Sequence, residues 1–164
     1  MVDMQKLSLR PGFLIRRLHQ IHMAIFAEEC ATFDVTPVQY SVMTVLLAQS
    51  DLDQASVAAQ VGIDRANTTD VIARLERKGW LSRKADVADA RLKRCALTPA
   101  GRKLALRMAE AVERAHARTI AALPEKQHAD FLAALQRLVD GAPEVRTRTN
   151  NGRTATREAS AVMP

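Results

Sequence analysis

The chain has 164 residues, and 24 Lys/Arg against 18 Asp/Glu give it a formal net charge of +6 at pH 7. Apolar residues make up 48% of the chain but aromatic residues only 4%, a composition that favours helices packed on helices. Runs of 18 or more apolar residues and a signal-peptide-like N-terminus are both missing, so we expect no membrane span and a cytoplasmic protein.

The first strong helical pattern begins at residue 11 or 12, after a polar start, and continues to about Phe33. Its apolar stripe is wide, so we expect the helix to contact both its own domain and a second chain. Two interpretations of its polar residues stay open. In the first, the histidines of this helix lie in a packing seam between helices. In the second, Arg16 or His19 meets an anionic ligand, because arginine binds a carboxylate through two hydrogen bonds, and Met23 is a further candidate ligand residue.

A second helix is predicted to begin at Thr36, which caps it, with Pro37 in its first turn. It should end near Ala48, with Val42 facing inward. Tyr40 on this helix is the only tyrosine of the chain. Core packing is its default role, although its hydroxyl needs a hydrogen-bond partner if it is buried.

Two shorter helical patterns follow and meet at a glycine. The first covers residues 54–61, and Gly62 then allows a sharp turn because glycine accepts positive φ. Asp64 is a good N-cap for the second helix, which buries a stripe that includes Ile72 and Leu75. The opposite face is small and polar, and it suits the major groove of DNA. The predicted DNA contacts on this helix are Arg65, Ala66, Asn67, Thr69, Asp70 and Arg74.

The polar side chains on this face have different expected roles. Asn67, Thr69 and Asp70 should decide sequence preference, since Asn pairs with adenine, Thr touches the thymine methyl and Asp accepts from cytosine N4. Arg65 and Arg74 should mostly add affinity for phosphates.

A hairpin is predicted after Gly79, a helix stop. One strand begins at residues 80–81, a polar loop covers 85–90, and the return strand covers 92–97. This gives a two-stranded β wing after the helix-turn-helix.

The wing supplies the remaining predicted DNA contacts, which are Asp89, Arg91 and Lys93. Arg91 at the tip can enter a narrow minor groove, and Asp89 can hold its guanidinium group in place. Residues 64–103 hold 11 Lys/Arg against 5 Asp/Glu, whereas the rest of the chain holds 13 of each. The excess positive charge therefore coincides with the helix and the wing, as phosphate binding requires. A merely solvated basic hairpin is the alternative interpretation.

Two further helices are predicted after the wing. The first begins at Thr98–Pro99 and runs to about Leu123, and the second covers residues 125–139 with an apolar face that needs a partner. Residues 141–164 are polar and should form a disordered tail.

The residues for enzyme or metal chemistry are not arranged in known motifs. The sequence has no Gly-rich phosphate loop, no G-x-S-x-G and no H-E-x-x-H, and no Cys/His cluster with zinc spacing. We therefore predict no catalytic residues, no metal and no cofactor. Cys30 and Cys95 leave a redox switch open as an alternative, although Glu28 and Glu29 should disfavour a thiolate at Cys30.

The stretch VGIDRANTTDVIARLERKGWLSR and the pattern D-x-R-x5-L-T resemble the MarR family of bacterial transcriptional regulators. The ordered match covers about residues 37–101. The pattern is formed by Asp89, Arg91, Leu97 and Thr98.

This resemblance implies a mainly α fold, in which a winged helix-turn-helix DNA-binding domain is joined to N- and C-terminal helical dimerisation regions. The expected boundaries are a dimerisation helix in 1–35, the DNA-binding domain in 36–100, dimerisation helices in 101–140 and the tail in 141–164.

The family also implies a function. Its members are homodimers whose recognition helices read a palindromic operator, and many release DNA when a small aromatic acid binds. Family pockets lie between the first helix, the second helix and the helix after the wing, so Tyr40 is a candidate ligand residue. We therefore expect a repressor that responds to an aromatic acid or its CoA thioester. The alternatives are an architectural DNA-binding protein without a ligand and a cysteine-based redox regulator.

Overall fold

The computed structural model describes residues 4–86 and 92–142. Helices dominate, as the composition predicts, and one small sheet accompanies them. In chain order the elements are η1 (Met4–Leu9), α1 (Pro11–Glu29), α2 (Pro37–Ala48), β1 (Leu52–Asp53), α3 (Gln54–Val61), α4 (Arg65–Arg77), β2 (Leu81–Ala85), β3 (Lys93–Leu97), α5 (Pro99–Ile120), η2 (Glu125–Gln127) and α6 (His128–Asp140).

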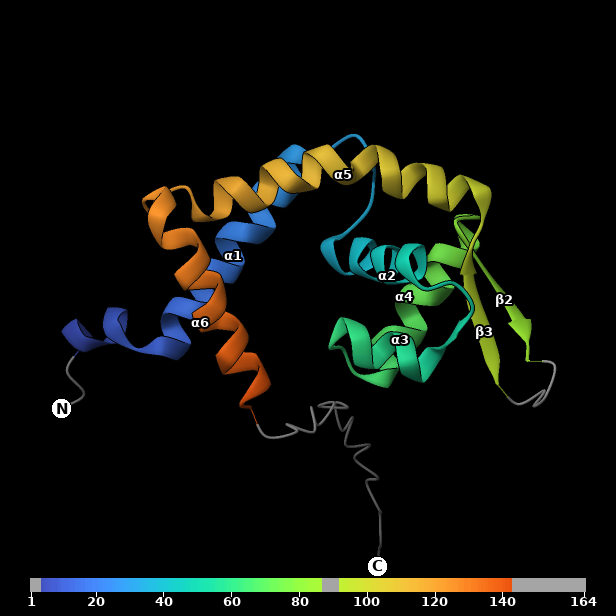
Figure 1. Ribbon diagram of the computed structural model, residues 1–164, viewed down its shortest axis with the longest axis horizontal. Coiled ribbons are helices and arrows are strands. Elements are labelled where there is room, and N and C mark those ends of the chain that lie inside the picture. The colour runs from blue at the N-terminus through green and yellow to red at the C-terminus, as the bar shows by residue number, and fades with distance from the viewer. Residues whose placement is uncertain (1–3, 87–91, 143–164) are drawn as a thin grey trace, which may run out of the picture.

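Figure 1 shows α5 running along the top of the molecule, from the β hairpin at one end to α1 and α6 at the other. On the hairpin side, α2, α3 and α4 gather beneath α5. On the opposite side, α6 turns back and descends beside α1. The two groups of helices are thus joined along α5, which packs against both α1 and α2.

Short polar side chains start the central helices. Thr36 forms a capping box with Gln39. The backbone N–H of Gln39 donates to Thr36 Oγ1 at 3.3 Å, and the backbone N–H of Thr36 donates to Gln39 Oε1 at 3.0 Å. Asp64 accepts from the Asn67 N–H at 2.9 Å, and Thr98 accepts from the Gly101 N–H at 3.1 Å. The three predicted helix starts are confirmed.

Two glycines adopt left-handed backbone conformations where the chain must turn. Gly62 has φ of 73° at the end of α3, and Gly79 has φ of 72° between α4 and β2. Residues with a Cβ rarely adopt this conformation, so these glycines define the turn of the helix-turn-helix and the entry into the hairpin.

The sheet has three strands in the order β1-β3-β2, whereas the sequence predicts two. The hairpin strands pair antiparallel from Leu81 with Leu97 to Ala85 with Lys93. The additional strand is β1, in which Leu52 pairs with Cys95. A strand of two residues is too short to show a periodic pattern, and its pairing depends on a contact with β3, which is distant in sequence.

The core lies where α2, α4, α5 and the sheet meet. Small residues on α5, such as Ala105 and Ala115, are buried and let the neighbouring helices approach closely. Thr68 is a buried polar exception at 1% exposure, and its hydroxyl donates to the Asp64 carbonyl at 2.8 Å. The largest fully buried side chains are Val42, Met43, Leu46, Val57, Ile72, Leu75, Leu81, Cys95 and Met108.

Some boundaries differ from the predicted ones. Helix α1 ends at Glu29 rather than near Phe33, and a turn follows in which the Phe33 N–H donates to the Cys30 carbonyl at 3.0 Å. Asp34 then has φ of 50°, which reverses the chain toward α2. The helix after the hairpin ends at Ile120, and the last helical segment begins as the 3-10 turn η2. Apart from residues 141 and 142, the predicted disordered tail lies outside the described residues.

Candidate nucleic-acid interface

Helix α4 has one buried side and one exposed side. Thr68, Ile72 and Leu75 face the core and are at most 1% exposed. All six predicted DNA contacts on this helix are exposed to solvent, namely Arg65, Ala66, Asn67, Thr69, Asp70 and Arg74. The helix therefore presents the predicted surface outward.

Hydrogen bonds within α4 hold two of these side chains. Asn67 Nδ2 donates to Asp64 Oδ2 at 2.6 Å, so the carboxylate that caps the backbone of α4 also binds the Asn67 side chain. Thr69 Oγ1 donates to the Arg65 carbonyl at 2.9 Å. These bonds orient both side chains, and Asn67 keeps its second amide hydrogen and its Oδ1 for a base edge.

Ion pairs attach the hairpin to its neighbours. Arg83 on β2 donates from Nε to Glu76 Oε2 on α4 at 2.8 Å, and this contact lowers the pKa of the Glu76 carboxyl. Arg94 on β3 pairs with Asp86 and also donates to the Asp51 carbonyl at 3.3 Å. The hairpin is thus tied both to the candidate recognition helix and to the segment before α3.

The predicted hairpin contacts have different outcomes. Lys93 is exposed at the start of β3, opposite Ala85 on β2. Asp89 and Arg91 lie outside the described residues, so their role stays a prediction.

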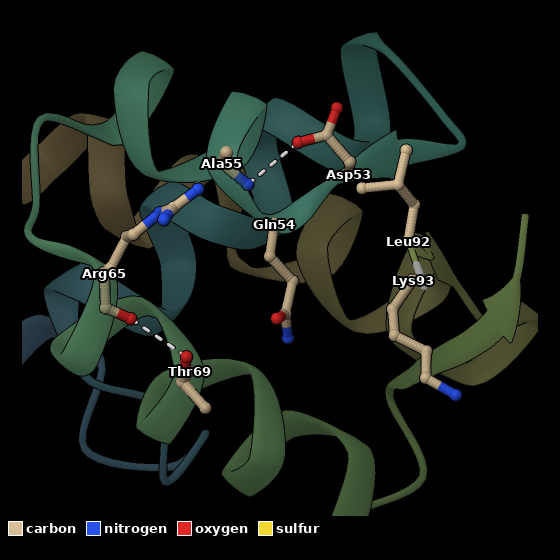
Figure 2. A pocket seen from close by; sticks show the side chains of 7 residues that line it. All are labelled: Asp53, Gln54, Ala55, Arg65, Thr69, Leu92 and Lys93. Atoms are coloured by element: carbon tan, nitrogen blue, oxygen red, sulfur yellow. Dashed lines mark hydrogen bonds between the residues drawn. The ribbon is translucent and has the colours of Figure 1, made fainter. Parts of the chain in front are cut away.

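A cleft of about 190 Å³ lies between the beginnings of α3, α4 and β3 (Figure 2). It shares Arg65 and Thr69 with the exposed face of α4, and it shares Lys93 with the hairpin. Sequence reasoning missed Gln54, the first residue of α3, which lines this cleft. The only available signal was Asp53, whose capping bonds place Gln54 at the helix start. The lining residues are Asp53, Gln54, Ala55, Arg65, Thr69, Leu92 and Lys93.

A second basic cleft, of about 480 Å³, lies at the other end of α4. Arg74, Arg77 and Lys78 line it, and Lys78 Nζ pairs with Asp34 Oδ2 at 2.7 Å. The excess positive charge predicted from the sequence is therefore found at both ends of the helix.

The four candidate ligand residues do not come together within one chain. Tyr40 is half-buried and lines a cavity of about 400 Å³ between α2, α3 and α5, together with His116. Arg16, His19 and Met23 are exposed on α1 and do not line this cavity.

Three features of the described residues concern functions other than DNA binding. Within residues 4–86 and 92–142, no group of three His, Cys, Asp or Glu side chains is placed to hold a metal ion. Both cysteines are buried, and burial raises the pKa of Cys30 and raises that of Cys95 to about 11. The helices of the described residues include no candidate for a membrane span.

Comparison with known proteins identifies the family and the fold. The model of the MarR family matches residues 35–93, from just before α2 to the start of β3. The PcaV transcriptional regulator of Streptomyces coelicolor, solved with its natural ligand, is 32% identical with a TM-score of 0.77, and the match covers 87% of this chain and 99% of PcaV. BpsR of Bordetella bronchiseptica, whose DNA binding is regulated by 6-hydroxynicotinic acid, is 30% identical with a TM-score of 0.78, covering 81% and 95%.

A third similar structure contains DNA. The transcriptional repressor CouR, solved on a 23-mer duplex, is 26% identical with a TM-score of 0.77, and the match covers 85% of this chain and 99% of CouR. The match to PcaV extends over nearly all of that regulator and over most of this chain. The chain belongs to the MarR family of transcriptional regulators.

Proposed function

We propose that this protein is a ligand-responsive repressor. A homodimer binds a palindromic operator through α4 and the hairpin of each subunit, and a small aromatic acid or its CoA thioester weakens that binding. Two regulators that are at least 30% identical to the chain support the proposal of a small-molecule ligand. PcaV was solved with its natural ligand, and the DNA binding of BpsR is regulated by 6-hydroxynicotinic acid.

The cavity lined by Tyr40 is the observation that carries the proposal. It lies where α5 meets α2 and α3, so a molecule bound there contacts the long helix and the helix-turn-helix together. A ligand changes DNA binding only if it binds the arrangement that does not fit DNA more tightly than the one that does. A ligand at this site contacts both parts of the molecule, so its affinity would depend on how they are arranged.

The lining of the cavity suits an aromatic ring with a polar substituent. Tyr40 supplies an aromatic surface and a hydroxyl, and His116 supplies an imidazole that can donate to a carboxylate. Glu113 also lines the cavity and would accept from a ring hydroxyl while repelling a second carboxylate. This favours a hydroxylated monocarboxylic acid. Arg16, His19 and Met23 stay candidates for a separate ligand contact on α1.

The burial of the cysteines disfavours the redox alternative. A thiol with a pKa of about 11 stays protonated at neutral pH, and the thiolate is the reactive form. Cys95 is fully buried between β1 and β2, so an oxidant reaches it only if the sheet opens.

The decisive measurement is operator affinity, by fluorescence anisotropy, with and without a panel of aromatic acids and their CoA thioesters. The operator is first selected from a random DNA pool. We expect one compound to weaken DNA binding at least tenfold and to raise the melting temperature of the free protein, because it binds the folded state.

Variants then test the cavity. Tyr40→Phe and His116→Gln should reduce the response to that compound but preserve DNA affinity without it. His128→Gln on α6, outside the cavity, is the matched control. If no compound in the panel changes DNA affinity, the architectural alternative is favoured.

A further inference from the structure

Both carboxylate oxygens of Asp64 are bound to the same residue, Asn67. Oδ1 accepts from the Asn67 backbone N–H at 2.9 Å, and Oδ2 accepts from the side-chain nitrogen Nδ2 at 2.6 Å. The first bond is an ordinary helix cap. The second bond is short, as is usual where the acceptor carries a charge, and it holds a side chain rather than the backbone.

Asp64 is itself held in place by its neighbours. The buried Thr68 donates from its backbone N–H and from its hydroxyl to the Asp64 carbonyl, at 2.9 and 2.8 Å. Asp64 is half-buried where the turn meets α4, whereas Asn67 is exposed in the first turn of the helix. The carboxylate is therefore a fixed support, and the exposed amide is the group whose orientation it determines.

The charge of Asp64 decides which end of the amide points outward. An ionised carboxylate accepts hydrogen bonds and donates none, so only the NH2 end of the Asn67 amide can bind it. If the amide were turned over, its oxygen Oδ1 would lie against Asp64 Oδ2 with no hydrogen between them. With the NH2 end on Asp64, Oδ1 and the second amide hydrogen are left for other partners.

This remaining edge of Asn67, an acceptor beside a donor, has a specific match among the bases. Adenine presents the N6 amino group and the acceptor N7 in the major groove, and asparagine binds both. Guanine presents two acceptors there, O6 and N7, so Oδ1 would face an oxygen. The reversed amide would lose this discrimination, because it would present the NH2 group to either purine.

Helix capping alone does not account for a carboxylate at this position. Thr36 and Thr98 cap α2 and α5 with a hydroxyl, and serine or threonine would cap α4 in the same way. A carboxylate within the basic segment 64–103 also repels DNA phosphates. The second carboxylate oxygen, which binds the Asn67 side chain, is what a hydroxyl cap lacks.

We propose that Asp64 is a positioning residue that makes Asn67 select adenine over guanine at one position of each operator half-site. In helix-turn-helix proteins the N-terminal residues of the recognition helix contact base edges, and Asn67 is the third residue of α4. Asp64 acts without contacting the base itself. It excludes the reversed amide and reduces the entropy that Asn67 loses when it binds the base. This inference rests on the proposed DNA-binding function.

Asp64→Ser tests this role, because serine preserves the cap but lacks the second carboxylate oxygen. We expect the ratio of the affinities for adenine and guanine at that position to fall by about two- to tenfold, the range for ordering one side chain. The other positions of the preferred sequence should stay unchanged. Binding-site selection, followed by anisotropy with operators that differ only in this base, measures the ratio. Removal of a negative charge should raise the affinity for every duplex, and that contribution cancels in the ratio.

Asp64→Asn is the matched variant, since it removes the same charge and also keeps the cap. The introduced amide oxygen stays with the Asn67 backbone N–H, so the introduced NH2 group faces the Asn67 side chain and favours its reversed orientation. We expect a larger fall in the adenine-to-guanine ratio than with Asp64→Ser. An effect of capping or of charge alone would give the two variants equal ratios.

The Asn67→Ala background isolates the contact between the two residues. Asp64→Ser should not change base preference there, because the side chain that it positions is gone. The proposal is overturned if Asn67→Ala relaxes the preference while both Asp64 variants keep the parental ratio. It is also overturned if Asp64→Ser changes the ratio equally in both backgrounds. If Asn67→Ala selects the parental sites, the base-reading role of Asn67 fails together with this inference. A parent that binds no duplex contradicts the DNA-binding function itself.

Discussion

His22 on α1 and His116 on α5 stack face to face, with ring centroids 5.4 Å apart and planes 11° from parallel. His22 Nδ1 also lies 2.9 Å from Thr119 Oγ1, one turn further along α5. Nearby, Glu29 accepts from Arg114 Nε at 2.9 Å and from Arg118 Nη1 at 2.7 Å. The histidine stack thus belongs to a seam of polar contacts that joins α1 to α5, and His116 faces the Tyr40 cavity from the same helix.

This stack predicts a pH-dependent stability. Burial, followed by the charges of His116 and His19, lowers the pKa of His22 below 6.5. As the pH falls below 6.5 the unfolded chain binds a proton at His22 before the folded chain does, so the free energy of unfolding should decrease. His22→Gln keeps a side-chain donor for Thr119 and should flatten this part of the profile in urea unfolding measured across that pH range. His128→Gln is the control, and identical profiles for parent and His22→Gln would contradict the prediction.

Gly101 should be intolerant of any side chain. A Cβ at this position, in the first turn of α5, would lie 1.9 Å from the Trp80 carbonyl oxygen, which also accepts from the Thr98 N–H. Neither group is at the end of a flexible side chain, so the backbone must move. We expect Gly101→Ala to reduce the free energy of unfolding by about 1–3 kcal/mol.

The matched control is Gly12→Ala in the first turn of α1, where an added Cβ meets nothing within 4 Å. It should be neutral or stabilise the protein by about 0.4–1 kcal/mol. Denaturant unfolding of the two variants should therefore give changes of different size, and equal effects would refute the steric argument at Gly101.

The exposed apolar face of α6 should form part of the dimer interface. Leu132, Leu138 and Val139 are 55%, 67% and 69% exposed, and α6 buries none of its residues against its own chain. A cleft of about 370 Å³ with an almost wholly apolar lining separates α6 from α1. Leu138→Glu should yield monomers by light scattering and weaken operator binding. Ala133→Glu adds the same charge on the opposite side of α6 and should stay dimeric, whereas a dimeric Leu138→Glu would place the interface elsewhere.

Asn67 and Arg74 should affect DNA binding in different ways. Asn67→Ala should relax the preference at particular base positions, because Asn reads adenine through two hydrogen bonds. Arg74→Ala should weaken binding to all sequences about equally and lower the salt slope by about one. Binding-site selection with both variants provides the measurement. If Asn67→Ala selects the same sites as the parent, its amide serves only the Asp64 cap.

Local interactions made much of the fold readable in the sequence. The caps at Thr36, Asp64 and Thr98 involve residues three positions apart, and the turns at Gly62 and Gly79 depend on one residue's backbone. The bounds of α3 and the outward face of α4 followed from helical spacing alone. The exposed face of α4, which is the candidate DNA contact, was therefore predictable residue by residue, because periodicity determines which side chains share a face.

Contacts between distant segments decided the rest. The strand β1 exists because Leu52 reaches Cys95, and the cleft at Gln54 exists because three elements converge there. The sequence grouped Tyr40 with Arg16 and His19, but the packing of α2 against α3 and α5 places the Tyr40 cavity apart from the exposed face of α1. Spacing along the chain carries no information about such pairings, since they depend on how whole helices dock through their combined apolar surfaces.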